Sequence, residues 1–332
     1  MRILIFGGGG FVGLNIAEAA LAAGHTVTLF DRALPQPALD ELAAIGPPCV
    51  GVTGDVRDAA AIRAAVDTGI DAVIYGAAIT ADAARDAEAP EDIIDINLTA
   101  LVRVLRAARA GGVRRIVNLS SIGALGAAAF PATADLLDET TAADPQSLYG
   151  LTKFAGERAC ARLAALWDLD VRSVRLSAVF GPWERATAVR STPSPQFQIA
   201  RCALAGHPAT LERPGVRDWL YAPDVAVAVL RLLEAPAPAH SLYHISTGQP
   251  YAALAWGEAL AAAAPHAGFE CRLARPGEAA TVSLYGNADR AIMRTALARA
   301  DFGFSARWGM RESVAHYARW IATHRWCLEA QA

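Results

Sequence analysis

Short apolar runs alternate with longer amphipathic segments through the first half of the chain. The runs are bounded by glycine or charged residues and are rich in β-branched and aromatic side chains, which is typical of buried strands. The predicted strands are Arg2–Phe6, Thr26–Phe30, Cys49–Thr53, Asp71–Tyr75, Ile116–Leu119 and Val171–Leu176. The predicted helices between them are Leu14–Ala23, a short helix within 33–47, Glu91–Ala110 and 152–167.

The order of these elements predicts the fold class. A strand followed by a helix, repeated several times, favours an α/β fold with a parallel, doubly wound sheet. Ligands of such sheets bind beyond the carboxyl ends of the strands. In the helix Glu91–Ala110, the predicted buried face consists of Ile94, Leu98, Leu101, Val102 and Leu105.

The second half of the chain has a less regular pattern. We predict a helix Val225–Leu233 capped by Asp224, a strand Leu242–Ile245, and terminal helices near 252–264 and 311–322. The segments 183–200 and 279–286 show no interpretable pattern.

Glycines follow the first predicted strand directly and precede a predicted helix. Two registers fit a dinucleotide-binding loop, Gly8/Gly10/Gly13 and Gly7/Gly10/Gly13, in which the helix N-terminus faces a pyrophosphate. Asp31 ends the next strand, where a carboxylate accepts from ribose hydroxyls and repels a 2′-phosphate. We therefore expect NAD, although the adjacent Arg32 leaves NADP open.

Two further strand ends belong to the predicted nucleotide site. Asp55 follows the third strand and either accepts from an adenine amino group or caps the next helix. Gly76, Ala77 and Ala78 follow the fourth strand, and their small side chains let a cofactor lie against the backbone.

Tyr149 and Lys153 are four residues apart and share one face of a predicted helix. A nearby ammonium favours the phenolate, so the tyrosine can exchange a proton with a substrate alcohol. Lys153 is the only lysine among the 30 Lys and Arg residues, which indicates a site where guanidinium does not substitute. The alternative is an exposed lysine beside a half-buried tyrosine.

Composition excludes several classes of protein. The 332 residues are 54% hydrophobic with a net charge of −3, which fits neither a disordered chain nor a nucleic-acid-binding protein. No apolar stretch is long enough to predict a membrane span. Five scattered cysteines favour neither disulfides nor a metal site, so we expect a cytoplasmic protein without a metal.

Taken together, the motifs resemble the extended short-chain dehydrogenase/reductase family, in its NAD-dependent epimerase/dehydratase branch. The resemblance runs through nearly the whole chain. It rests on the glycine loop with Phe11, Asp31, Gly54-Asp55-Val56, Gly76-Ala77-Ala78, Asn97, Ser120-Ser121, Tyr149 with Lys153, Arg175 with Gly181-Pro182, Gly215-Val216-Arg217-Asp218 and Arg275-Pro276-Gly277-Glu278.

The resemblance implies a division of the chain and a set of roles. It implies an NAD-binding Rossmann domain over 1–176, to which about 215–250 return, and a smaller α/β substrate-binding domain over 177–330. Tyr149 would be the acid/base, Lys153 would bind the nicotinamide ribose, and Ser121 would hydrogen-bond the reacting oxygen. The implied cofactor-binding residues are Gly7, Gly10, Phe11, Val12, Gly13, Asp31, Arg32, Asp55, Val56, Ala77, Ala78, Asn97, Tyr149 and Lys153.

Departures from the family pattern restrict the chemistry. Ile122 and Gly123 stand where dehydrating members have Asp-Glu, so we do not expect water elimination. Leu125 replaces a tyrosine, and Ala178 replaces an asparagine that contacts a nucleotide diphosphate. Ser121, Ile122, Ala178, Arg217 and Arg275 are the predicted substrate-binding residues. The two arginines are candidates for holding phosphate or carboxylate, or for ordinary surface pairing.

Three functions follow as hypotheses. The first is an NAD-dependent oxidoreductase acting on a secondary alcohol of a sugar, sugar acid or related polyol. The second is a nucleotide-sugar epimerase that retains its NAD, and the third is a dinucleotide-binding sensor or scaffold without catalysis. We favour a small carbohydrate-like substrate without a nucleotide. The resemblance also implies a homodimer paired through the 92–110 and 152–167 helices.

Overall fold

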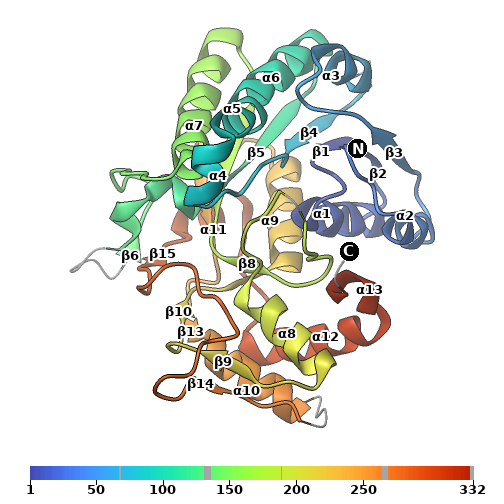
Figure 1. Ribbon diagram of the computed structural model, residues 1–332. Helices are drawn as coiled ribbons and strands as arrows, with labels where there is room; N and C mark the ends of the chain where they lie inside the picture. The colour runs from blue at the N-terminus through green and yellow to red at the C-terminus, as the bar shows by residue number, and fades with distance from the viewer. Residues whose placement is uncertain (67–68, 131–135, 188, 264–267, 330–332) are drawn as a thin grey trace.

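The computed structural model describes residues 1–66, 69–130, 136–187, 189–263 and 268–329. A parallel seven-stranded sheet forms its centre, in the order β12-β7-β5-β4-β1-β2-β3 (Figure 1). In that order the strands are Leu242–Ile245, Val171–Leu176, Arg115–Ser121, Ala72–Tyr75, Arg2–Phe6, Thr26–Asp31 and Cys49–Thr53. The predicted Rossmann-type, doubly wound sheet is confirmed.

Both faces of the sheet are buried, because successive side chains of a strand point to opposite faces. In β1, Ile3 and Ile5 belong to one core, whereas Leu4 and Phe6 belong to the other. The first core is covered by α1 (Phe11–Ala22), α2 (Gln36–Ala43) and α9 (Ala222–Glu234). The second is covered by α3 (Ala59–Ala65), α6 (Ala100–Ala110) and α7 (Leu148–Trp167).

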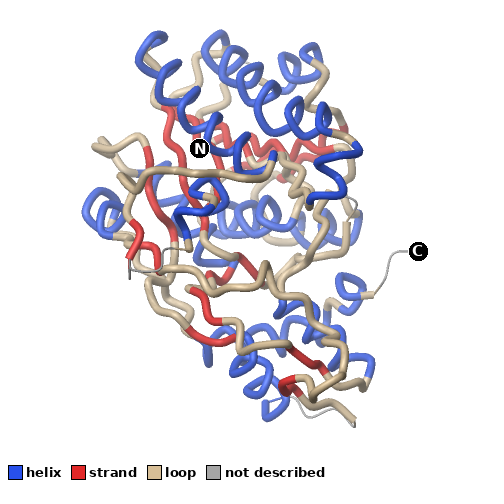
Figure 2. Tube along the Cα trace, turned by 60° about the vertical axis from the view of Figure 1, so that its left-hand side comes forward, coloured by secondary structure: helices blue, strands red, loops and turns tan. Residues whose placement is uncertain are grey.

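The second half of the chain interleaves with the first. β12 pairs with β7 in the main sheet, and α9 packs against α1. The remaining elements form the lower part of the molecule (Figures 1 and 2), where α8, α10 and α12 pack together. These elements are β8 (Val179–Phe180), α8 (Pro195–Ala205), β9 (Ala209–Leu211), β10 (Val216–Arg217), β11 (Leu220–Tyr221), β13 (Tyr251–Ala252), α10 (Ala253–Ala263), β14 (Cys271–Leu273), α12 (Met310–Thr323) and α13 (Arg325–Leu328). The helix α11 (Ala296–Phe302) packs instead against β12 and α9.

Short elements connect these two parts. They are α4 (Ala83–Glu88), β6 (Leu136–Leu137), β15 (Ile292–Met293) and the 3₁₀ turns Ile122–Leu125 and Ala127–Ala129. β6 pairs with β15, so a loop that leaves the main sheet is held by a segment near the end of the chain.

The predicted helix Glu91–Ala110 contains a π-helical turn. It consists of α5 (Pro90–Ile94), the π turn Asp95–Thr99 and α6. The wider turn rotates the residues before it relative to those after it, so the predicted buried face is partly wrong: Leu101 and Leu105 are buried, whereas Ile94 is 41% exposed. Ile93 and Ile96 are buried instead.

Asp224 does not cap α9, contrary to the prediction. Tyr221 is the N-cap residue, and Asp224 lies within the first turn. Its carboxylate accepts hydrogen bonds from the backbone N–H groups of Arg307 and Trp308 at 2.9 and 3.0 Å, which holds the approach to α12 against α9. Residue 264 of the predicted helix 252–264, and residue 330 of the predicted substrate domain, lie outside the described residues.

Candidate functional site

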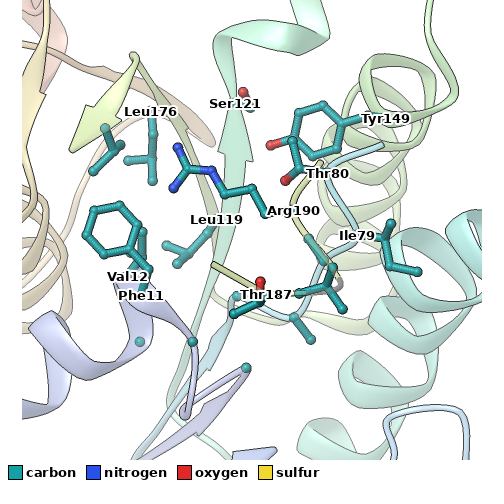
Figure 3. A pocket seen from close by; sticks show the side chains of 18 of the residues that line it. Phe11, Val12, Ile79, Thr80, Leu119, Ser121, Tyr149, Leu176, Thr187 and Arg190 are labelled. Carbon is teal, nitrogen blue, oxygen red and sulfur yellow. The ribbon is translucent and has the colours of Figure 1, made fainter. Parts of the chain in front are cut away.

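A cavity of about 850 Å³ opens at the carboxyl ends of the sheet strands. Its walls come from both halves of the chain, from the glycine loop after β1 to Tyr285 and Arg290. Figure 3 shows part of the lining, including Phe11, Tyr149 and Arg190. Of the predicted site residues, those that line it are Gly7, Gly10, Phe11, Val12, Gly13, Asp31, Arg32, Asp55, Val56, Ala77, Ala78, Ser121, Ile122, Tyr149, Lys153, Ala178 and Arg217. Asn97 and Arg275 do not line it.

The glycine loop adopts the Gly7/Gly10/Gly13 register. Gly7 has φ +80°, and a Cβ on it would lie 2.5 Å from the Ala77 nitrogen. Gly8 packs instead against Leu29, away from the cavity. A Cβ on Gly13 would lie 2.4 Å from the Gly7 carbonyl oxygen, so only glycine lets α1 begin this close to the loop. The resulting cradle fits the pyrophosphate of a dinucleotide.

Asp31 lies at the edge of this cradle. Its carboxylate accepts from the Gly9 N–H at 3.0 Å, and burial raises the pKa of the side chain although the backbone hydrogen bonds oppose this. Arg32 lines the same part of the cavity but is exposed. The roles of Asp31 and Arg32 toward the ribose stay predictions.

The structure excludes one of the two predicted roles of Asp55, that of the helix cap. Asp58, not Asp55, caps α3 by accepting from the Ala60 N–H at 2.7 Å. Asp55 lines the cavity and pairs with Arg57 at 2.7 Å, and hydrogen bonds from Arg57 lower its pKa. Its role toward adenine stays a prediction.

Tyr149 and Ser121 face each other across the inner end of the cavity (Figure 3). The Ser121 hydroxyl oxygen accepts from the Gly123 N–H at 3.0 Å, which fixes its position at the end of β5. A Cβ on Gly123 would lie 3.1 Å from the Tyr149 ring, so this glycine lets the ring pack closely against the turn. A side chain at this position would require a small shift of the Tyr149 ring or of the turn.

The environment of Tyr149 differs from the sequence-based expectation. Burial raises its pKa, while hydrogen bonding with Ser121, the charge of Arg190 and hydrogen bonding with Thr80 act against the rise. Lys153 is not among these stabilising groups. Its Nζ lies 5.7 Å from the centre of the Tyr149 ring and donates to the Leu119 carbonyl at 2.8 Å. Burial lowers the pKa of Lys153 to about 8.

A buried ion pair lies one helical turn beyond Lys153. Glu157 binds the Arg175 guanidinium at 2.7 Å and accepts from the Ser120 hydroxyl at 2.5 Å. Both members of the pair are almost completely buried. The pair therefore joins α7 to β5 and β7 close to Ser121 and Lys153, and this gives Arg175 of the sequence motif a structural role.

Asn97 lies in the π turn and acts at a distance from the cavity. Its Oδ1 accepts from the Ile79 N–H at 2.8 Å, and its Nδ2 donates to the Ile79 carbonyl and to Thr152 Oγ1. Thr152 in turn donates to the Tyr149 carbonyl at 2.9 Å. Asn97 thus holds the loop after β4 against the start of α7, which positions Thr80 and Tyr149 without contacting the cavity.

Three arginines converge on the tyrosine end from distant parts of the chain. Arg190 extends between Phe11 and Tyr149 (Figure 3), pairs with Glu184 at 2.8 Å and donates to the Tyr285 hydroxyl. Arg217 is 3% exposed and donates to the Tyr285 carbonyl. Arg290 lines the cavity, and its Nε is buried without a hydrogen-bond partner.

Arg275 and Leu125 are not placed as the substrate hypothesis assumed. Arg275 is exposed on the outer turn after β14, where its N–H donates to Glu278. Leu125 is buried in a small apolar cluster with Ile122, Leu137 and Met293, because the 3₁₀ turn directs it away from the cavity. Only Ala178 of the two noted replacements forms part of the cavity wall.

Sequence reasoning missed Thr80, Arg185, Arg190, Tyr285 and Arg290, all of which line the cavity. Arg185, Arg190 and Tyr285 fall in the segments that show no regular pattern. Thr80 had a usable signal, since it lies two residues after the small residues Gly76, Ala77 and Ala78. The others are brought to the cavity only by the folding of the second half over the sheet.

The structure contains no helix, among its described residues, that is long and apolar enough to cross a membrane. All five cysteines are free thiols. Within the same residues, no group of three or more histidine, cysteine, aspartate and glutamate side chains is placed to hold a metal ion.

Comparison with known proteins adds relatives that act on sugars and sugar acids. The D-erythronate dehydrogenase of Cupriavidus necator is 32% identical over 69% of this chain and 71% of its own. A probable UDP-glucuronate 4-epimerase of Rhizobium meliloti is 29% identical over 71% of this chain and 69% of its own. The UDP-glucose-4-epimerase of Stenotrophomonas maltophila, solved with NAD and formylated UDP-arabinopyranose, has the same fold, with a TM-score of 0.79, 23% identity and coverage of 98% and 99% of the two chains.

The family assignment rests on a match that covers most of the chain. The model of the NAD dependent epimerase/dehydratase family matches residues 3–248, which include the glycine loop, Asp31, Ser121, Tyr149 and Lys153. The protein therefore belongs to the NAD-dependent epimerase/dehydratase family and is an NAD-dependent enzyme of the dehydrogenase or epimerase type.

Proposed function

We propose that the protein is an NAD-dependent oxidoreductase that interconverts a secondary alcohol and a ketone on a small sugar acid. The observation that carries this proposal is the pair Arg217 and Arg290. Both guanidinium groups line the tyrosine end of the cavity, and neither forms an ion pair with a carboxylate of the described residues. A negatively charged substrate group would supply the missing counter-ion.

The electrostatics of this pair support an anionic ligand. Burial, and secondly the charge of Arg290, lower the pKa of Arg217 to about 9, so both groups remain charged at neutral pH. The carboxylate of Asp218 also acts on Arg290, but its oxygens already accept from Ser177, Ser246 and the Met293 N–H. Two like charges in a desolvated space are stabilised when an anion binds between them.

The catalytic step uses groups that the structure places together. In oxidation, Tyr149 as phenolate takes the substrate hydroxyl proton while Ser121 donates a hydrogen bond to the same oxygen, and the C–O bond becomes C=O. Bound NAD supplies the hydride acceptor. In reduction the protonated Tyr149 returns its proton to the oxygen. Lys153 would hold the nicotinamide ribose from beneath, where its ammonium is fixed by Leu119.

The substrate without a nucleotide is supported by the wall around Ala178 and by the D-erythronate dehydrogenase among the relatives. An apolar alanine offers no hydrogen bond to a diphosphate. A carboxylate that occupies Arg217 and Arg290 would place a short polyol chain toward Ser121 and Tyr149. A short sugar acid would therefore have partners for its carboxylate in Arg217 and Arg290, and partners for its hydroxyl group in Ser121 and Tyr149.

The second candidate is a nucleotide-sugar epimerase that retains NAD. Arg217 favours it as well, because a guanidinium binds phosphate as readily as carboxylate, and relatives of this chain include UDP-sugar epimerases. The epimerase uses the same Tyr149 but returns the hydride to the opposite face. A sensor or scaffold without catalysis is disfavoured, since it has no use for the assembled Ser121, Tyr149 and Lys153.

Two measurements separate these functions. NADH should accumulate at 340 nm when free aldonates or uronates are supplied with NAD⁺, and it should not accumulate with nucleotide sugars. Calorimetry of UDP, GDP and dTDP against the NAD-loaded protein should show no tight binding. Micromolar affinity for any of the three nucleotides, without NADH release, would replace this proposal by the epimerase.

We also propose a homodimer in a reducing cytoplasm. Ile94 on the α5–α6 helix and Leu151 on α7 are 41% and 45% exposed, so each helix of the proposed pairing offers an apolar side chain to a partner. The five free thiols are compatible with a reducing compartment. Light scattering of the purified protein should give twice the mass of the chain, and a monomer would contradict the proposed pairing.

A further inference from the structure

The segment 182–187, here called the strap, lies directly above the glycine loop. It is held to α1 by two side-chain hydrogen bonds. Asn15 Nδ2 donates to the Pro182 carbonyl at 2.7 Å, and Trp183 Nε1 donates to Glu18 at 2.8 Å. Trp183 has φ +66°, in the left-handed region that non-glycine residues rarely adopt. The strap is therefore fixed in an unusual backbone conformation by its contacts with the helix that follows the glycine loop.

This conformation places Arg185 on the glycine loop itself. Arg185 Nη2 donates to the Gly9 carbonyl at 2.7 Å, and the guanidinium lies over the Trp326 ring at 5.7 Å. Arg185 lines the cavity, and no carboxylate of the described residues forms an ion pair with it. Among the described residues, its hydrogen-bond partners are two carbonyl oxygens, those of Gly9 and Trp183. The cation therefore has hydrogen-bonding capacity left for an anion.

The neighbouring end of α1 is built to receive such an anion. Gly10 is its N-cap and provides no side-chain hydrogen bond, and the first turn carries no acidic residue. The free N–H groups and the positive end of the helix dipole favour phosphate, but the helix itself contributes no charged side chain. The other cavity cations apart from Arg32 belong to the tyrosine end, as described above. Arg185 is the cation that the fold places beside the N–H groups of the glycine loop.

We propose that Arg185 binds the pyrophosphate of NAD, with its Gly9 hydrogen bond exchanged for one to a phosphate oxygen. This goes beyond the proposed substrate and needs only the NAD dependence of the family. The planar guanidinium suits two phosphate oxygens, which is the geometry that a diphosphate presents. Because the strap is fastened to α1, the guanidinium stays beside the start of the helix, where both can contact the same pyrophosphate.

The alternative role is structural, in which Arg185 only holds the glycine loop through the Gly9 carbonyl. The two roles predict different changes in ligand affinity when the charge of Arg185 is removed. A phosphate-binding arginine affects only ligands that carry phosphate. A structural arginine affects every ligand of the loop, including adenosine.

The test compares Arg185→Gln and Arg185→Lys with the wild type, using NAD⁺, ADP and adenosine as ligands. Arg201→Gln is the matched control, because Arg201 is exposed on α8, far from the cavity lining. Affinity is measured by calorimetry or by quenching of tryptophan emission, and weak adenosine binding by ligand-observed NMR. The melting temperature of each variant reports whether it is folded.

We expect Arg185→Gln to weaken NAD⁺ and ADP by about 10- to 100-fold and adenosine by less than about 2-fold, as a lost charge-assisted hydrogen bond predicts. Arg185→Lys should recover part of the affinity, and the salt dependence of ADP binding should fall in Arg185→Gln. Equal losses for adenosine and ADP, or an unchanged ADP affinity, would overturn the proposal. None of these readouts depends on the substrate, so they remain valid if the proposed sugar-acid activity fails.

Discussion

The two ends of the cavity are built in different ways. The cofactor end consists mostly of backbone from one stretch of sequence, the glycine loop and the start of α1, with Asp31 contributed by the next strand. The tyrosine end consists of side chains from separate segments, namely Ser121, Tyr149, Arg190, Arg217 and Arg290. One end is therefore defined by local chain geometry and the other by tertiary convergence.

The two ends of the cavity also differ in the charge of the side chains that line them. Asp31 and Asp55 lie at the cofactor end, where carboxylates suit ribose and adenine donors. Arg190, Arg217 and Arg290 gather at the tyrosine end, where the charges of Arg190 and Arg290 act against the rise in the pKa of Tyr149. The two ends of one cavity thus differ in the charged side chains that line them. Mutations at one end should leave binding at the other end nearly unchanged.

The largest effect is expected at Tyr149. Tyr149→Phe removes the acid/base but keeps the ring against Gly123, so turnover should fall by about 10²- to 10⁴-fold while NAD⁺ affinity changes little. Steady-state rates and calorimetry on the same preparation measure both quantities. Retention of more than about a tenth of the wild-type rate would mean that another base operates.

The next largest effect is expected at the two arginines that form no ion pair, Arg217 and Arg290. Their substitution should change the KM for the substrate but not the affinity for NAD⁺. Arg217→Met and Arg290→Met should each raise KM for a sugar acid by about 10- to 100-fold, because each removes charge-assisted hydrogen bonds to the substrate. NAD⁺ affinity should stay within about 2-fold. Arg275→Met is the matched control, since Arg275 lies on the outer surface. A comparable KM increase in the control would contradict the assignment.

A smaller effect is expected at the opposite end. Asp31→Asn should shift the ratio of NADP⁺ to NAD⁺ affinity by about tenfold toward NADP⁺, because the repulsion of a 2′-phosphate is lost. Asp40→Asn on the adjacent α2 is exposed and provides the control. Tighter binding of NADP⁺ than NAD⁺ by the wild-type protein would show instead that Arg32 dominates.

The smallest effect is a shift of the pH profile. Oxidation needs the Tyr149 phenolate, so its rate should rise with pH through a pKa that burial raises. Arg190 stabilises the phenolate, and Arg190→Gln should therefore move this rise to higher pH by about one unit. In the reduction direction, which needs protonated Tyr149, the loss of rate at high pH should move the same way. An unchanged profile in a folded variant would show that Arg190 does not influence the tyrosine.

Much of the cofactor end could be predicted from the sequence. Its residues lie at, or directly after, the ends of predicted strands, and those strand ends line the cavity. A strand, a glycine turn and a helix that are consecutive in sequence must also be adjacent in space, so Gly7, Gly13 and Asp31 were found without a structure. The pair Tyr149 and Lys153 was found for the same reason, since helical spacing fixes its face. The sequence pattern left the register of the glycines undecided, and close packing against Ala77 and Leu29 decided it.

The substrate end depended on the tertiary structure. Arg275 belongs to a recognisable motif yet lies on the surface, while Arg190 and Arg290 belong to none and line the cavity. The apolar spacing of Glu91–Ala110 gave a helix, but the π turn changed which residues are buried. Sequence alone predicted the sheet, the glycine loop and the shared helix face of Tyr149 and Lys153, because these follow from local periodicity and short spacing. Only the folding of the second half over the sheet decided which arginines meet at Tyr149, since contacts between distant segments leave no periodic trace in the chain.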